Sequence, residues 1–282
     1  MKQVKLNIVF SLQIIILVSY FQFIVPQCSF NYFTSNLSPA DYLSNLGNHN
    51  DIRNKVALGN QLVAGVPLPK AANMVELVWN DNLAKIAQAW ALQLVNNCSG
   101  LDNNPNRNLI GFSYVGENIY WRGSKNDPGT PATAVFLASE SWKSEVNDFS
   151  PSFVNKFTET ETYHFTQQIW AGTTDIGCGY AHYKDGIWAH AEFVVCNYGV
   201  GGNMLGSPIY ITGEPCSQCP TGYNCSTSTS RKGLCSNGGV PIPTISQITD
   251  SYASNSTTTT NSTNLRMIAF VYISLVLLSF IL

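Results

Sequence analysis

The chain of 282 residues contains few charged residues and no run of basic ones. Charged residues make up 11% of the sequence, and the formal net charge at pH 7 is −2. Proteins that attract nucleic acids concentrate Lys and Arg in a patch or along one face. We therefore expect no nucleic-acid partner.

The sequence also lacks the second C-x-x-C pair that a zinc ribbon needs. Cys216 and Cys219 form one such pair, and no histidine lies near it to complete a tetrahedral zinc site. Residues 1–27 have a basic start followed by an apolar run, which is typical of a secretory signal peptide. A small-x-small cleavage site is not evident, so an uncleaved signal anchor is the alternative. In an exported chain, eight cysteines indicate four disulfides.

The C-terminal part of the chain changes character twice. Residues 237–264 are rich in Ser, Thr and Asn, which predicts a disordered stalk, and residues 265–282 form a hydrophobic tail. The tail is short for a membrane span and no basic residue follows it, so it fits a GPI-attachment signal. We expect an extracellular protein on the cell surface through a GPI anchor, with secretion or a C-terminal transmembrane helix as alternatives. Glycosylation sequons begin at Asn97, Asn224, Asn255 and Asn261.

Three stretches have the apolar spacing of helices. They are residues 43–62, the stretch that follows Asn80, and residues 132–148. Asn80 is a suitable N-cap because its side chain can accept from the first free N–H groups. We expect His49 in the first helix to be a structural or a surface residue and Trp90 in the second to belong to the core, with no functional role for either.

Two later stretches read as a β-hairpin. Residues 175–183 and 187–196 are rich in strand-forming residues and are joined around Asp185 and Gly186, a strong turn signal. Cys178 and Cys196 lie on the two arms, so a disulfide across the hairpin is sterically reasonable. Helices followed by a hairpin predict an α+β fold.

The most informative stretch is 163–170, which reads Tyr-His-Phe-Thr-Gln-Gln-Ile-Trp. Upstream, Glu117 lies in Gly-Glu-Asn-Ile-Tyr and Glu145 ends Ser-Trp-Lys-Ser-Glu. One imidazole and two carboxylates can form a polar site if the fold brings them together.

These motifs resemble those of the CAP superfamily, which contains cysteine-rich secretory proteins, insect antigen 5 and plant pathogenesis-related proteins. His164 to Trp170 fits the family's H-[FY]-T-Q-x-[VIL]-W motif, and residues 195–204 fit its Cys-Asn-Tyr motif. Residues 78–84 and 87–91 resemble the family's early helix. The resemblance covers residues 49–210 and is nearest to the antigen-5-like branch.

The resemblance implies a three-layer α-β-α sandwich with a mixed sheet for residues 28–213, followed by a small disulfide-rich hinge at 214–236. Relatives suggest that Cys28 pairs with Cys98. They also suggest an interleaved hinge pattern, Cys216–Cys225 and Cys219–Cys235. Because the hinge has no apolar pattern, we expect its disulfides alone to hold it.

The resemblance also implies a cleft in which two histidines and two glutamates can hold a divalent metal. Glu117, Glu145 and His164 match three of these positions, and Asp102 falls where the other histidine is expected. One imidazole with carboxylates favours Ca²⁺, Mg²⁺ or Mn²⁺ over Zn²⁺. The alternative is that both glutamates brace the fold through hydrogen bonds to the backbone and to His164. We expect no required cofactor and at most weak metal binding.

Three functions stay open at this point. The first, as relatives suggest, is a non-catalytic extracellular module that binds a lipid, a sterol or a protein ligand. The second is a cell-surface adhesion or signalling scaffold with a vestigial cleft. The third is a metal-dependent hydrolase or protease that uses His164 and a glutamate. Ser141 lies one turn from Glu145 but outside any G-x-S-x-G context, so the enzyme is the least favoured.

Overall fold

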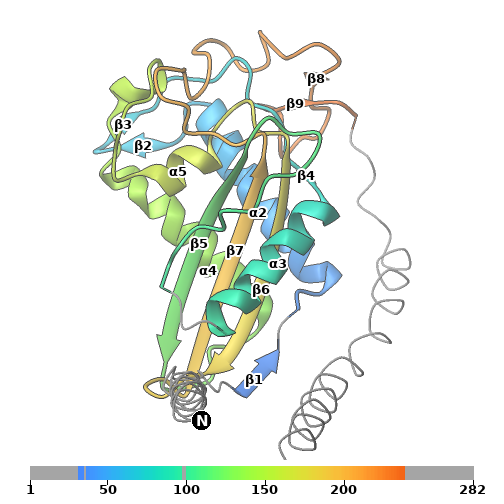
Figure 1. The fold of residues 1–282 in the computed structure, drawn as a ribbon. Helices are drawn as coiled ribbons and strands as arrows, with labels where there is room; N and C mark the ends of the chain where they lie inside the picture. The colour runs from blue at the N-terminus through green and yellow to red at the C-terminus, as the bar shows by residue number, and fades with distance from the viewer. Residues whose placement is uncertain (1–30, 35, 97–99, 239–282) are drawn as a thin grey trace, which may run out of the picture. The chain divides into compact units, whose positions relative to one another are not determined.

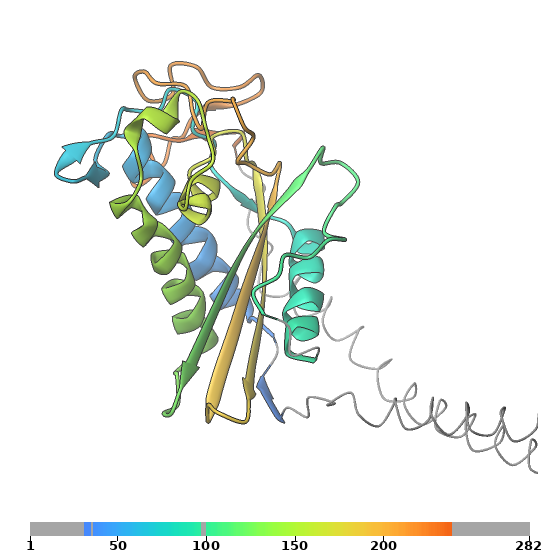
Figure 2. The same cartoon turned by 60° about the vertical axis from the view of Figure 1, so that its left-hand side comes forward.

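The computed structural model describes residues 31–34, 36–96 and 100–238. The expected signal peptide, the Cys28–Cys98 pair, the stalk, the tail and the sequons at Asn97, Asn255 and Asn261 lie outside the described residues. Within them, no helix is long and apolar enough to cross a bilayer. They form three layers, with a sheet between α3 on one face and α2, α4 and α5 on the other (Figures 1 and 2).

The sheet is built around three long strands. β5 (Val115–Ser124), β6 (Asp175–Lys184) and β7 (His190–Gly199) stand in the order β6-β7-β5, and all are antiparallel. β1 (Asn31–Thr34) pairs with β6, and β4 (Val78–Trp79) pairs with β6 in parallel. The sheet is therefore mixed, and the expected three-layer α-β-α sandwich is confirmed. Two small hairpins are β2 (Leu62–Val63) with β3 (Val66–Pro67), and β8 (Asn224–Cys225) with β9 (Cys235–Ser236).

The helices differ from the predicted ranges mainly at their ends. α2 (Pro39–Ala57) begins four residues earlier than predicted, because Ser38 and Asp41 form a capping box there. α3 (Asp81–Asn96) begins as predicted, since the Asn80 side chain accepts from the N–H groups of residues 82 and 83. α4 (Pro131–Ser144) continues as a 3₁₀ turn, Glu145–Asn147, and a second 3₁₀ turn covers Pro151–Val154. α5 (Tyr163–Gln168) was not predicted.

The β6–β7 hairpin has the predicted disulfide. Cys178 and Cys196 are direct cross-strand partners and are bonded, with Cα atoms 4.1 Å apart. Gly179 on the same strand lets α3 approach closely, because a Cβ there would lie 2.3 Å from the Gln88 Cα. Helix α3 therefore packs directly on the backbone of β6.

Residues 214–238 are fixed to the rest of the fold by more than disulfides. Cys216–Cys225 and Cys219–Cys235 are both present. In addition, Leu234 is fully buried in the same apolar cluster as Met74, and the Cys235 N–H donates to the Met74 carbonyl. Arg231 forms an ion pair with Glu76 over 2.9 Å. The expectation that disulfides alone hold the hinge is therefore wrong, because a single buried leucine was not visible as a pattern.

Helix α2 meets the core through polar side chains as well as apolar ones. Arg53 is fully buried and donates hydrogen bonds to five backbone carbonyls. These are the carbonyls of Val75, Gln168, Trp170, Ala171 and Thr173, at 2.8–3.3 Å. All five guanidinium N–H groups are satisfied, and burial lowers the pKa of Arg53 to about 9. Arg53 thus joins α2 to the segment before β4 and to the connection between α5 and β6.

Candidate functional site

A cavity of about 640 Å³ lies beside the outer edge of β5. The upper part of β5 runs between α5 on one side and the segment that precedes β5 on the other (Figure 2). Polar side chains, glycines and a rim of apolar side chains line the cavity: Leu101, Asn103, Arg107, Tyr114, Gly116, Glu117, Asn118, Ile119, Tyr163, His164, Gln167, Gly202, Asn203 and Met204. The cavity contains two of the four residues that the sequence singles out.

Glu145 and His164 are brought together at the start of α5. Glu145 Oε1 lies 2.6 Å from His164 Nδ1, and Glu145 Oε2 accepts from the backbone N–H groups of His164 and Phe165 at 3.0 Å each. A carboxylate is favourable there because the first N–H groups of a helix have no partner within the helix. In the neutral form of the imidazole, Nδ1 donates to the carboxylate and Nε2 is an acceptor. Trp142 stacks near the ring, with centroids 6.3 Å apart.

Glu117 enters the cavity from β5. Its Oε1 accepts from the Asn104 N–H over 2.6 Å, while its Oε2 is buried without a partner among the described residues. Burial raises the pKa of Glu117 to about 7, against the opposing effects of the Asn104 bond and the positive charge of Arg107. The protonated and ionised forms of Glu117 therefore coexist near neutral pH.

Asp102 does not reach the cavity. Leu101 and Asn103 line it, whereas Asp102 between them is exposed to solvent and is not a lining residue. Its backbone carbonyl accepts from the Trp90 indole N–H over 2.9 Å, which anchors this part of the chain to α3. The expectation that Asp102 takes the fourth place in the cleft is therefore not met. Trp90 packs against the core on the α3 side of the sheet, as predicted, and also makes this anchor.

The expected metal ligands do not form a compact set. Among the described residues, the one group of three or more His, Cys, Asp or Glu ligand atoms within 4.8 Å of one another is Cys216, Cys219 and Cys235, whose sulfurs are in disulfides. Both oxygens of Glu145 and Nδ1 of His164 are used within the fold. His164 Nε2 and Glu117 Oε2 are the two possible metal-ligating atoms without a hydrogen-bond partner among the described residues. Two ligand atoms are too few for a zinc centre.

A second cavity of about 480 Å³ adjoins the first. The two share Tyr114 and Met204 as lining residues. The lining of the second is mostly apolar, and it includes Trp170, Val200, Ile209 and Ile211. No sequence pattern pointed to this cavity, because its walls come from segments that are far apart along the chain.

Two amides that the sequence reasoning passed over position the cleft. Gln167 accepts from the Gly202 N–H at 2.8 Å, and Asn118 donates to the His164 carbonyl at 3.1 Å. Gly116 has no room for a side chain, because a Cβ there would lie 2.1 Å from Gln167 Oε1. All three lie within the motifs around Glu117 and His164, so these motifs indicate the residues that shape the cleft as well as its ionisable groups.

Comparison with known proteins finds a matching family model and several similar proteins. The family model described as the cysteine-rich secretory protein family, CAP, matches residues 46–198. Venom allergen 5 of Vespa mandarinia is 40% identical over 193 residues, which are 66% of this chain and 87% of that protein. CRISP/Allergen/PR-1 of Trittame loki is 37% identical over 227 residues, which are 77% of this chain and 53% of that protein. The chain spans about half the length of the latter and of Tityus serrulatus venom allergen 5, at 47%.

Solved structures agree with this comparison. The crystal structure of NaASP2 with Zn²⁺ is 30% identical with a TM-score of 0.58, over 72% of this chain and 98% of that chain. The structure of BmVAL-1 is 29% identical with a TM-score of 0.60, over 73% of this chain and 98% of that chain. Both are similar to this chain over nearly their whole length.

Proposed function

Because the chain belongs to the cysteine-rich secretory protein (CAP) family and is an extracellular CAP-domain protein, we propose that it is a non-catalytic binding module. The observation that carries the proposal is the lining of the cavity beside β5. It holds His164 and Glu117 but no Ser, Thr, Cys or Lys that could attack a substrate. Ser141, the one nucleophile that the sequence offered near Glu145, is exposed on α4 and does not line the cavity.

The adjoining apolar cavity supports a lipid or sterol as one ligand of this module. Its volume of about 480 Å³ lies in the range of small-molecule sites, and its walls are mostly apolar. A protein ligand is the second ligand class that we propose for the cleft. An adhesion scaffold that does not use the cleft is the alternative, and it predicts that changes in both cavities are without effect on binding.

The test is organic extraction and native mass spectrometry of the full-length chain produced in a eukaryotic secretory host. We expect a lipid or sterol to co-purify, and Ser113→Trp to reduce its amount severalfold, because Ser113 is exposed and lines the apolar cavity. Ser141→Trp is the matched control, since Ser141 is also exposed but lines neither cavity. Equal lipid in the two variants would exclude this cavity as the site.

The hydrolase alternative has one structural observation in its favour. The Glu145 carboxylate holds the His164 ring, which leaves Nε2 as a base. Hydrolysis of a peptide or ester library by the wild-type chain, abolished in His164→Ala, would replace the non-catalytic proposal. A divalent metal at His164 and Glu117 is at most weakly held on this donor set, although the related NaASP2 structure contains Zn²⁺.

We further propose that the protein is held at the cell surface by a GPI anchor. Support comes from the composition of residues 265–282 and of the stalk before them. Phosphatidylinositol-specific phospholipase C should release the protein from cells that express it. Retention after this treatment, with the tail still detected by an antibody, would favour a transmembrane helix.

A further inference from the structure

The outer edge of β5 presents backbone groups that the sheet does not use. In β6, the Ile176 carbonyl accepts from the Asn80 N–H beside β4. The backbone N–H and C=O groups of the even-numbered residues of β6 therefore point away from β7. Because Gly177 lies opposite Asn197, the odd-numbered residues of β6 and β7 form backbone hydrogen bonds with each other. The even-numbered residues of β7 then form theirs with β5, where Asn118 lies opposite Cys196. It follows that the odd-numbered residues of β5 point their N–H and C=O groups outward.

The outward groups belong to Val115, Glu117, Ile119, Trp121 and Gly123. The Val115 carbonyl accepts from the Arg107 side chain at 2.7 Å, which closes the upper end of the edge. The Ile119 carbonyl has one distant donor, the Trp142 indole at 3.4 Å. No other hydrogen bond to these outward groups occurs among the described residues, so from residue 117 to residue 123 the outward groups are unpaired except for the Ile119 carbonyl.

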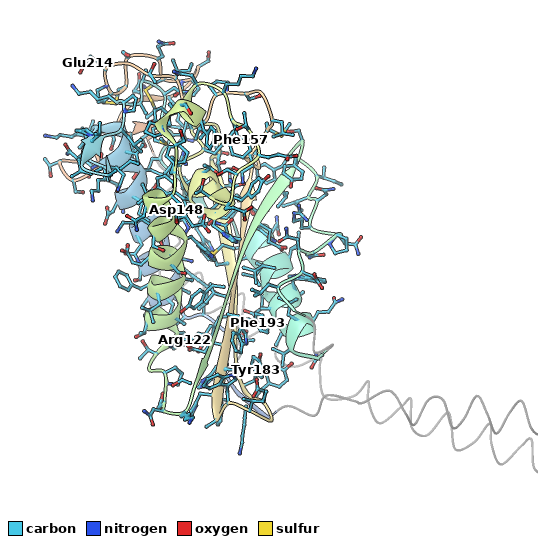
Figure 3. The ribbon with its side chains drawn as sticks, turned by 90° about the vertical axis from the view of Figure 1, so that its left-hand side faces the viewer. Arg122, Asp148, Phe157, Tyr183, Phe193 and Glu214 are labelled. Carbon is cyan, nitrogen blue, oxygen red and sulfur yellow. A yellow bond between two sulfur atoms is a disulfide. The ribbon has the colours of Figure 1, made fainter. Side chains whose placement is uncertain are left out.

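This edge lacks three of the devices that normally keep sheet edges from pairing, namely a bulge, a lysine and a proline. β5 pairs with β7 through ten consecutive residues without a bulge, and its sequence contains neither Lys nor Pro. Its two charged side chains are both turned back into the fold. Glu117 accepts from the Asn104 N–H, and Arg122, labelled in Figure 3, pairs with the buried Glu192. A long, regular edge without a bulge, a lysine or a proline can pair with another strand.

We propose that the edge of β5 from residue 117 to 123 binds an extended segment of another polypeptide by strand addition. This inference specifies the protein ligand of the proposed binding module and rests on that function. Outward N–H and C=O groups that recur at every second residue match the backbone of an extended peptide. An acyl chain or a sterol ring has no series of hydrogen-bonding groups that could pair with these outward N–H and C=O groups.

The surroundings of the edge favour a single peptide strand over a second copy of this chain. β5 lies between α4 on one side and α3 with the segment before β5 on the other (Figure 3). At its upper end, Glu117 and Ile119 line the cavity together with Leu101 and Tyr163 from the flanking segments. An edge that lies in a cavity of one copy cannot meet the same edge in another copy, whereas an extended segment can enter it.

The side chains beside the edge indicate what the peptide carries. Alternate residues of an added strand lie on opposite faces of the sheet. On the α3 face they would lie near Trp121 and Leu101, and on the other face near Tyr163; all three are substantially exposed. We therefore expect apolar or aromatic side chains at alternate peptide positions.

The first test pans the full-length chain against a phage library of random linear peptides and compares two variants at one position. Trp121→Pro and Trp121→Val both lose the indole and its bond to Tyr183, but only proline removes the outward N–H. We expect the selected peptides to bind Trp121→Val about five- to tenfold more tightly than Trp121→Pro. Equal affinities, or no selected peptide, would overturn the proposal.

The second test leaves the protein unchanged, which guards against misfolding of the proline variant. N-methylation is placed at each backbone nitrogen of a selected peptide in turn. Strand addition predicts that binding to the wild-type chain weakens at every second position and persists between them. A loss without this period of two, or self-association of the chain that Trp121→Pro abolishes, would overturn the proposal. A co-purified lipid with no selected peptide would leave the binding module in place and remove strand addition alone.

Discussion

The hydroxyl of Tyr198 donates a hydrogen bond to Nε2 of His49 over 2.9 Å, in the buried space between α2 and the sheet. His49 Nδ1 donates in turn to the Asn45 carbonyl at 3.0 Å. On the other side, Asn118 donates both to the Tyr198 oxygen and to the backbone carbonyl of His164. A neutral histidine in the core is thus connected through two side chains, Tyr198 and Asn118, to the backbone of the cleft histidine.

The first prediction concerns pH and His49. Burial lowers the pKa of His49 from 6.5 to about 4. As the pH falls below 6.5, the unfolded chain binds a proton that the folded chain does not, so the stability of the folded state declines until about pH 4. The total loss is about 3 kcal/mol. Urea unfolding from pH 7.5 to 4.5 should show this slope in the wild type and a flatter one in His49→Gln. Parallel slopes would contradict a neutral buried His49.

The second prediction concerns Arg53. Arg53→Met removes all donors to five buried carbonyls, and Arg53→Lys supplies three donors in place of five. We expect Arg53→Met to cost about 3–5 kcal/mol and Arg53→Lys somewhat less, because fewer carbonyls lose their partners. Thermal unfolding of the two variants measures both effects. A change in Tm of only a degree or two in Arg53→Met would show that the carbonyls find other donors.

The third prediction concerns Glu145 and the tautomer of His164. With the carboxylate in place, we expect the neutral His164 ring to carry its proton on Nδ1. Glu145→Ala removes that acceptor and the cap of α5, so the ring should shift toward the Nε2–H tautomer and stability should fall by about 1–2 kcal/mol. Nitrogen-15 chemical shifts of the imidazole report the tautomer. An unchanged tautomer would mean that another group holds the ring.

The fourth prediction concerns zinc and Asp102. The wild-type chain should bind Zn²⁺ weakly, because His164 Nε2 and Glu117 Oε2 are the donors left available in the cleft. Asp102→His should not increase the affinity, since residue 102 does not line the cavity. Titration calorimetry at pH 7.4 tests both statements. A tenfold gain in Asp102→His would place residue 102 in the cleft after all.

The fifth prediction concerns the attachment of the hinge. Leu234 is fully buried in the main apolar cluster, so Leu234→Ala should destabilise the whole described domain by about 2–5 kcal/mol. If disulfides alone held the hinge, the variant would unfold like the wild type. Ile187→Ala is a control, because Ile187 is 84% exposed.

The sequence predicted the layers of the fold better than the ends of its elements. The apolar stripe after Asn80 and the hairpin around Asp185 have local causes, a cap and a turn, and both elements were predicted. The second arm of the hairpin, however, is β7 at residues 190–199 and not 187–196. The start of α2 was placed late, because the Ser38 cap precedes a stretch with little apolar character. α5 has only six residues, which is too short for a periodic pattern.

The sequence predicted only part of the candidate site, because some of its residues lie in motifs and others do not. Glu145 and His164 were expected to lie together and do, since both belong to recognised motifs. Asp102 was assigned by counting residues through a loop, and its carbonyl anchor to Trp90 could not be read from the sequence. The open edge of β5 is invisible in any local pattern, because it depends on which strand is outermost.

The bonds of Arg53 also bear on when the chain acquires its structure during synthesis. The carbonyls of Gln168, Trp170, Ala171 and Thr173 lie 115 to 120 residues after Arg53 in the sequence. While a ribosome has not yet delivered residue 173, the guanidinium has no way to leave water with its donors satisfied. Helix α2 therefore cannot take its final place early in translation. Closure of the domain around Arg53 therefore waits until residue 173 has been synthesised.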